Sequence, residues 1–151
     1  MFEELSQQLE KRIKEFFLKM GYEVELKILR NDKIFKVDIQ TKNSQELIGE
    51  KGKTLMEIQH ILNAIFKKEI KNEIFIDLDI EGYKERKIKY LKELARSVAD
   101  EVALTKKEKI LEPMSAYERR IIHLELASRP DVITESIGKE PKRRVAIKPY
   151  P

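Results

Sequence analysis

The chain has 151 residues, of which 41% are hydrophobic and 38% charged, and its formal net charge at pH 7 is +4. This length suits one ordinary domain or two small ones, and no apolar run approaches the ~18 residues of a membrane helix. Because cysteine is absent and the N-terminus is acidic without an apolar signal core, we expect no disulfide, no thiolate metal site, no secretion signal and a cytoplasmic location.

The first 40 residues predict a helix followed by a hairpin. Apolar residues recur at helical spacing over residues 2–20, and Gly21 suits a stop. The period then changes to two, with apolar and polar residues alternating over residues 22–28 and again over 35–39. Asn31-Asp32 suits the turn between these two strands.

The next 40 residues predict two helices and a strand. Asn43-Ser44 can cap a short helix that runs to Ile48, and a longer amphipathic helix follows the sequence "GEKG". The apolar positions of that longer helix are Leu55, Ile58, Ile61, Leu62, Ile65 and Phe66. Lys71-Asn72 suits a turn, and "EIFIDLDI" (73–80) alternates as a strand does. The first half therefore predicts the order α-β-β-α-α-β.

The second half begins with a long helix from about Tyr83, which we expect to connect two domains as well as to supply core. Its apolar stripe consists of Ile88, Leu91, Ala95, Val98 and Val102. Ile110-Leu111 suits a short strand that ends before Pro113.

A second helix opens at "SAYE", where Ser115 and Glu118 match a capping box. The apolar positions of this helix are Tyr117, Ile121, Ile122 and Leu126, and it ends before Pro130. Two strands, "DVITESIG" (131–138) and "RRVAIKP" (143–149), are joined by "KEPK". The second half therefore predicts the order α-β-α-β-β, and the whole chain an α+β protein.

The stretch "LIGEKGKTL" (47–55) has two competing interpretations. A nucleotide-binding P-loop requires G-x-x-x-x-G-K-[ST], but Leu47 stands where its first glycine should be. The predicted order of elements also lacks the βαβ crossover that carries a P-loop. An NTPase is therefore not supported.

The other interpretation is a G-x-x-G loop between two helices, in which the glycines let the backbone approach a sugar–phosphate chain. The candidate RNA-binding residues are Ile48, Gly49, Glu50, Lys51, Gly52 and Lys53. An ordinary helix–turn–helix corner with a glycine C-cap explains a bare G-x-x-G equally well. Together with the order α-β-β-α-α-β, however, "IGEKGKTL" makes residues 1–81 resemble a KH domain of type II. Glu50 departs from the basic or neutral residue usual in that family, which implies weak binding.

"SAYERRIIH" contains Arg119-x-x-x-His123, and this spacing places both side chains on one face of a helix. With the strands that follow, residues 82–151 resemble the R-three-H domain, a module that binds single-stranded nucleic acid. The resemblance implies that Arg119 and His123 contact phosphate or bases. The candidate residues are Arg119, Arg120, His123, Lys142, Arg143 and Arg144.

Two alternatives within this second module stay open. Adjacent strand residues face opposite sides, so we do not expect Arg143 and Arg144 both to contact a ligand. The His123 ring can instead hydrogen-bond inside the fold and position Arg119.

The distribution of charge agrees with a polyanionic partner. Residues 1–80 carry 14 basic and 15 acidic side chains, whereas residues 81–151 carry 17 and 12. A modestly basic second half favours nucleic acid or a membrane surface as the partner. Many soluble proteins share this balance, so the charge alone decides nothing.

A KH domain that leads into "MSAYERRIIH" and "TESIGKEPKRRV" resembles the Jag family, the SpoIIIJ-associated bacterial RNA-binding proteins. Members usually carry an N-terminal Jag domain, which we expect to be missing here. The resemblance also implies pairing with a small single-KH protein or self-association as a homodimer, and a role in cell-envelope and division control.

These observations favour a non-catalytic protein that binds single-stranded RNA through two modules in tandem, without a cofactor or metal. The alternatives are a single-stranded DNA-binding protein, a duplex-DNA-binding protein, and a protein-interaction scaffold with a weak KH site. An enzyme is disfavoured because only His60 and His123 are available, in different halves of the chain, and no nucleophile motif accompanies them.

Overall fold

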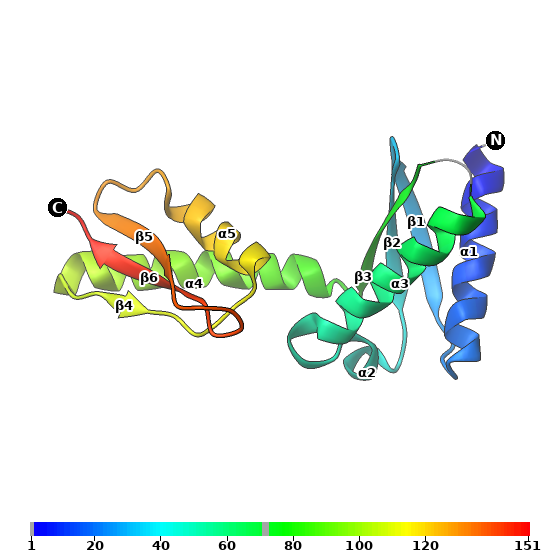
Figure 1. The fold of residues 1–151 in the computed structure, drawn as a ribbon, viewed down its shortest axis with the longest axis horizontal. Helices are drawn as coiled ribbons and strands as arrows, with labels where there is room; N and C mark the ends of the chain where they lie inside the picture. The colour runs from blue at the N-terminus through cyan, green and yellow to red at the C-terminus, as the bar shows by residue number, and fades with distance from the viewer. Residues whose placement is uncertain (1, 71–72) are drawn as a thin grey trace. The chain divides into compact units, whose positions relative to one another are not determined.

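The computed structural model describes residues 2–70 and 73–151, and the chain divides into two compact units, Met1–Lys84 and Glu85–Pro151. Each unit is a small α+β structure with its own three-stranded sheet (Figure 1). The expected turn at Lys71-Asn72 lies outside the described residues.

The first unit follows the order α-β-β-α-α-β. Its elements are α1 (Phe2–Lys19), β1 (Glu25–Asn31), β2 (Ile34–Gln40), α2 (Ser44–Ile48), a short 3-10 turn η1 (Glu50–Gly52), α3 (Lys53–Glu69) and β3 (Phe75–Ile80). The sheet order is β1-β2-β3, with β1 antiparallel to β2 and β2 parallel to β3. The strand β3 begins at Phe75, two residues later than the sequence pattern indicated.

The hairpin turn of the first unit differs by one residue from the expectation. Asn31 is the last residue of β1 and pairs with Ile34, so the turn is Asp32-Lys33 rather than Asn31-Asp32. Asp32 has a φ of +56°. A short polar side chain such as that of Asp tolerates this left-handed conformation better than most side chains do.

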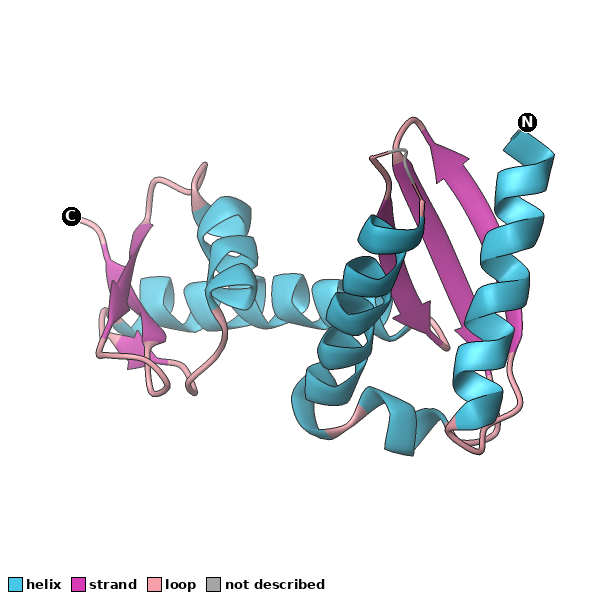
Figure 2. Cartoon of the chain, turned by 45° about the vertical axis from the view of Figure 1, so that its right-hand side comes forward, coloured by secondary structure: helices cyan, strands magenta, loops and turns pink. Residues whose placement is uncertain are grey.

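Helices α1 and α3 cover the same face of the first sheet (Figure 2). Alternate residues of β2 and β3 point into this layer, and the helices close it with one apolar stripe each. The fully buried side chains include Leu9, Ile13, Phe17, Phe35, Val37, Ile39, Leu55, Leu62, Ile76, Leu78 and Ile80. Ile61, expected in the core, is 45% exposed because the buried stripe runs through Leu55, Ile58, Leu62 and Phe66.

The second unit contains the remaining elements. They are α4 (Tyr83–Thr105), which begins in the first unit, β4 (Lys109–Ile110), α5 (Ala116–Leu126), β5 (Val132–Ile137) and β6 (Arg144–Pro149). Both β4 and β5 pair antiparallel with the central strand β6. The strand β4 lies one residue earlier than the expected Ile110-Leu111.

The core of the second unit lies between α4, α5 and one face of its sheet. Its buried residues include Leu91, Ala95, Ala99, Val102, Ile122, Leu126, Val132, Val145 and Ile147. On α4, Ala99 is buried while Val98 only packs against the cluster. Tyr117 was expected in the apolar stripe of α5 but is 63% exposed. The Ser115 hydroxyl caps α5 as expected, accepting a hydrogen bond from the Glu118 backbone N–H at 3.2 Å.

Candidate nucleic-acid interface

The G-x-x-G loop (residues 49–52) has a backbone that ordinary side chains rarely adopt. Gly49 and Gly52 have φ values of +74° and +79°, and Lys51 between them has a φ of +55°. The loop is closed by two backbone hydrogen bonds, from Gly49 N–H to the Gln45 carbonyl at 3.0 Å and from Gly52 N–H to the Gly49 carbonyl at 3.3 Å. It therefore forms a tight corner between α2 and α3.

Neither glycine has room for a side chain in the observed packing. A Cβ at position 49 would overlap the Thr54 hydroxyl oxygen. A Cβ at position 52 would lie 2.7 Å from Cε1 of Tyr83, closer than real Cβ contacts allow. Two glycines at this spacing therefore serve the fold, whatever the loop binds.

The side chains of the loop divide by exposure. Glu50, Lys51 and Lys53 are exposed, so two cations and one anion face solvent. Ile48, one of the sequence candidates, is only 9% exposed and belongs to the hydrophobic core. Its position anchors the loop to the fold.

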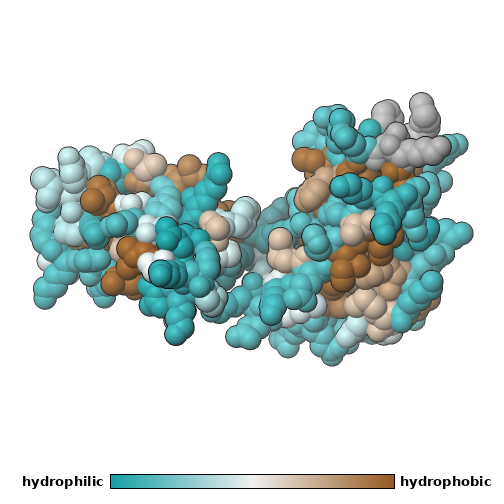
Figure 3. Space-filling model, viewed as in Figure 1, coloured by the Kyte–Doolittle hydropathy of each residue, from teal (hydrophilic) through white to brown (hydrophobic). Residues whose placement is uncertain are grey.

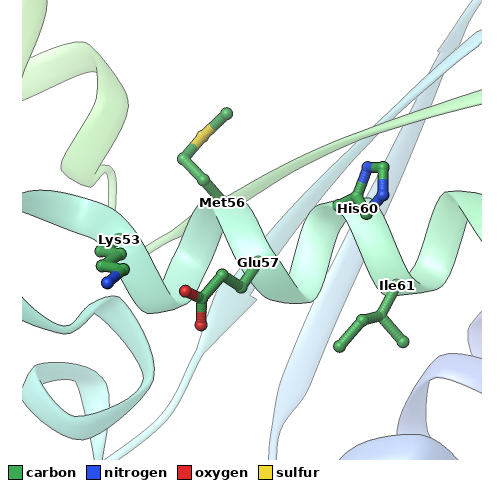
Figure 4. A pocket seen from close by; sticks show the side chains of 5 residues that line it. All are labelled: Lys53, Met56, Glu57, His60 and Ile61. Carbon is green, nitrogen blue, oxygen red and sulfur yellow. The ribbon is translucent and has the colours of Figure 1, made fainter. Parts of the chain in front are cut away.

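The outer stripe of α3 (Lys53, Met56, Glu57, His60 and Ile61) lines a shallow depression next to the loop (Figure 4). Met56 and Ile61 are 51% and 45% exposed, and apolar surface is visible on the first unit in Figure 3. Apart from Lys53, sequence reasoning did not select these residues for binding. The sequence did contain a signal for this surface. Ile61 is apolar but lies outside the stripe of α3 that the core buries.

The inner polar residues of α3 close the free edge of β3. Asn63 pairs with the backbone of Ile76, donating from Nδ2 to the carbonyl at 2.9 Å and accepting from the N–H at 2.7 Å. The Leu78 N–H donates to Gln59 Oε1 at 3.0 Å, and Lys84 Nζ donates to the same oxygen. Side chains thus supply the partners that another strand would otherwise offer to this edge.

In the second unit, Arg119 is buried, with 7% of the residue exposed. Its Nη2 forms an ion pair with Glu140 Oε1 at 2.7 Å, and its Nε donates to the Met114 carbonyl at 3.3 Å. Glu140 is the residue that sequence reasoning missed here, because it lies 21 positions along the chain from Arg119. The guanidinium is therefore engaged by the protein.

Both ring nitrogens of His123 are hydrogen-bonded within the second unit. Nδ1 lies 2.7 Å from Thr134 Oγ1 and Nε2 lies 2.7 Å from Ser136 Oγ. Burial, and then the positive charge of Arg119, lower the pKa of His123 below its ordinary value of 6.5. A neutral imidazole donates through one nitrogen and accepts through the other, and the two hydroxyls can complement either tautomer.

The turn between β5 and β6, here called the hairpin turn (residues 138–143), carries Lys142 and Arg143, two of the four remaining candidates. Arg143 donates from Nη1 to the Gly138 carbonyl at 2.9 Å and lies 3.5 Å from the Ser136 carbonyl through Nη2. Arg144 pairs with Ile137 in the sheet and donates from Nε to the Lys142 carbonyl at 3.2 Å. Within residues 2–70 and 73–151, the side chains of Arg120, Lys139 and Lys142 are exposed and have no recorded hydrogen bond or ion pair.

Two further observations concern the described part of the chain only. No group of three or more His, Asp or Glu side chains there is placed to hold a metal ion. No helix there combines the length and apolar character needed to cross a membrane.

Comparisons with known proteins found a matching domain model and several relatives. Residues 89–149 match the model of the R-three-H domain, so the second unit carries the module expected from the sequence. The chain is 35% identical over 130 residues to a protein of Clostridium symbiosum named RNA-binding protein KhpB, covering 86% of the chain and 59% of that protein. Proteins of the same name from Lactiplantibacillus plantarum and Bacillus subtilis are 32% and 33% identical, over 85% and 67% of the chain and 40% and 50% of their own lengths.

The chain belongs to the Jag family, of which these KhpB proteins are members. It spans about half the length of these curated relatives.

Proposed function

We propose that the chain is a non-catalytic protein that binds single-stranded RNA. The observation that carries this proposal is an R-three-H domain whose hairpin turn presents exposed lysine side chains beside the R-x-x-x-H helix. Relatives over most of the chain are named RNA-binding proteins. Cations on a turn can contact phosphate without any sequence-specific contact.

The first unit is proposed to be a KH domain of type II over residues 1–81, joined to the R-three-H domain over residues 82–151. The order α-β-β-α-α-β, and a G-x-x-G loop between α2 and α3, support this assignment. In this proposal Lys51 and Lys53 contact phosphate, and the outer stripe of α3 offers Met56 and Ile61 to the bases. Glu50 opposes the phosphate, so this site is expected to be weak.

Two weak sites on one chain gain affinity when a single strand can reach both, because the second contact becomes intramolecular. Binding of one strand by both sites is therefore the proposed source of affinity. The family resemblance extends this to post-transcriptional control of the cell envelope or division, which crosslinking in cells and sequencing of the bound RNA would test.

Fluorescence anisotropy with single-stranded RNA across a range of salt concentrations tests the proposal. Affinity should fall as salt rises, with a slope of about −0.7 per phosphate contact in a plot of log affinity against log salt. Replacing Glu50 and Lys51 with Asp should weaken binding, whereas Lys11→Asp on the exposed side of α1 makes the same change in net charge and should not. Absence of binding even at low salt would reject the proposal, and turnover of RNA or of nucleoside triphosphates would reject its non-catalytic part.

A protein-interaction scaffold is the second candidate. The exposed Met56 and Ile61 on the outer stripe of α3 favour it, because apolar side chains beside a depression also suit a protein partner. A small single-KH protein or a second copy of the chain would be such a partner. Competition between single-stranded RNA, single-stranded DNA and duplex DNA separates the nucleic-acid alternatives.

A further inference from the structure

We propose that Arg119 and His123 hold the β5–β6 hairpin against α5, and that Lys139 and Lys142 make the phosphate contacts of the second unit. This inference rests on the proposed RNA-binding function. It gives the R-x-x-x-H pair a positioning role and assigns binding to side chains outside that pair.

Arg119 joins three segments of the second unit. Its Nη2 reaches Glu140 in the hairpin turn, and its Nε reaches the Met114 carbonyl in the segment before α5. The Met114 N–H in turn donates to the Arg143 carbonyl at 3.1 Å, at the end of the same turn. Only 9% of the Arg119 side chain is exposed, which leaves little of the guanidinium for a ligand.

His123 makes the second connection between α5 and the hairpin. Thr134 and Ser136 alternate along β5 and therefore face the same side, the side that carries α5. The hydroxyls of Thr134 and Ser136 are hydrogen-bonded to the two ring nitrogens of His123. A base or phosphate would have to break one of these hydrogen bonds to reach a ring nitrogen. Arg143 is also engaged, by the carbonyls of Ser136 and Gly138.

Lys139 and Lys142, the two lysines of the hairpin turn, are exposed and remain available for contact with phosphate. The Lys142 N–H donates to the Lys139 carbonyl at 2.8 Å, which makes residues 139–142 a β-turn with the two lysines at its ends. The Cα atoms at the ends of a β-turn lie within about 7 Å of each other. Two exposed lysines thereby extend from neighbouring backbone positions, and their ammonium groups can contact neighbouring phosphates of one strand.

The ion pair also explains how Arg119 influences binding without contact. Glu140 lies between the two lysines in the chain, and 61% of its side chain is exposed. An unpaired carboxylate at this position would repel phosphate. The Arg119 guanidinium neutralises the Glu140 carboxylate. The positive charge of Lys139 and Lys142 is therefore not offset by an acidic side chain between them.

The first arm of the test measures binding of a short fluorescein-labelled oligouridine strand by the full chain across salt concentrations. Lys139→Gln and Lys142→Gln should each reduce the salt slope by about 0.7 and the affinity at ~0.1 M salt about fivefold. Lys11→Gln on α1 is the matched control and should leave both unchanged. An unaltered slope in the Lys139 and Lys142 variants would overturn the inference.

The second arm separates the positioning role of Arg119 from direct contact. Arg119→Met should weaken binding because Glu140 loses its partner, and adding Glu140→Gln should restore the affinity to within about twofold of the wild type. Direct contact predicts instead that the double variant stays weak although its hairpin remains closed. Hydrogen–deuterium exchange over residues 132–149 shows whether each variant keeps its hairpin closed.

A third measurement needs no variant. RNA bound to the wild-type chain should protect Lys139 and Lys142 from acetic anhydride and leave Lys11 reactive. Unprotected lysines in a chain that binds RNA would overturn the inference, whereas a chain that binds no RNA at low salt would instead reject the proposed function.

Discussion

Gly21 and Gly49 both have positive φ values, +92° and +74°, but their surroundings differ. A Cβ added at Gly21 meets no described atom within 4 Å, whereas one at Gly49 overlaps the Thr54 side chain. Gly21→Ala should therefore cost only backbone strain, about 1–2 kcal/mol. Gly49→Ala should cost about 1–3 kcal/mol more, because overpacking against Thr54 is added and because a φ of +74° with a ψ of −179° is almost confined to glycine.

Urea denaturation of the two variants checks this difference. Equal losses of unfolding free energy would show that Thr54 moves aside without cost. In that case the backbone conformation at position 49, and not the contact with Thr54, would account for the glycine.

Single residues also show what one sequence can reveal. Arg119 and His123 were identifiable because their spacing of four is a local property of a helix. Their partners were not, since Glu140, Thr134 and Ser136 lie 21, 11 and 13 positions away and reach the helix only through the fold. The alternative in which His123 hydrogen-bonds inside the fold agrees with the observed contacts of its ring.

The closure of the β3 edge is a property of two elements acting together. Asn63→Ala should leave both backbone polar groups of Ile76 without their side-chain partners, at a cost of about 1–3 kcal/mol. It should also make the edge available for pairing with another chain and so increase aggregation. Glu57→Ala, on the outer stripe of the same helix, is the control.

Thermal unfolding combined with light scattering measures both effects. The prediction fails if the Asn63 variant is as stable and as monodisperse as the Glu57 variant.

The elements themselves were largely predictable, whereas their limits were not. Apolar periodicity depends on burial of whole faces, so it located the long helices and the longer strands of both halves in the described residues. The short helix α2 was located from its capping residues instead, and the 3-10 turn η1 was not predicted. The ends depend on individual hydrogen bonds, which moved the first hairpin turn to Asp32-Lys33 and β4 to Lys109–Ile110. The exposure of Ile61 and Tyr117 depends on what packs opposite them, which periodicity cannot show.

At the scale of the whole molecule, the two hydrophobic clusters have no residue in common. Ile122→Ala, at a fully buried position of the second cluster, should cost about 2–5 kcal/mol in the second unit. Hydrogen–deuterium exchange should then rise over residues 116–149 and stay unchanged over 34–40. Leu62→Ala in the first unit should produce the reciprocal pattern.

Faster exchange in both units of either variant would contradict this expectation. It would show that the two units unfold as one cooperative structure.

The aromatic ring that lies against Gly52 limits how the G-x-x-G loop can move. Tyr83, at the start of α4, leaves no room for even a methyl group on that side of the loop. The loop can therefore be displaced away from the ring but hardly towards it, so its motion is one-sided. In the proposed function, a strand that presses the loop against this ring displaces the loop little, so little of the binding free energy is spent on deforming the protein.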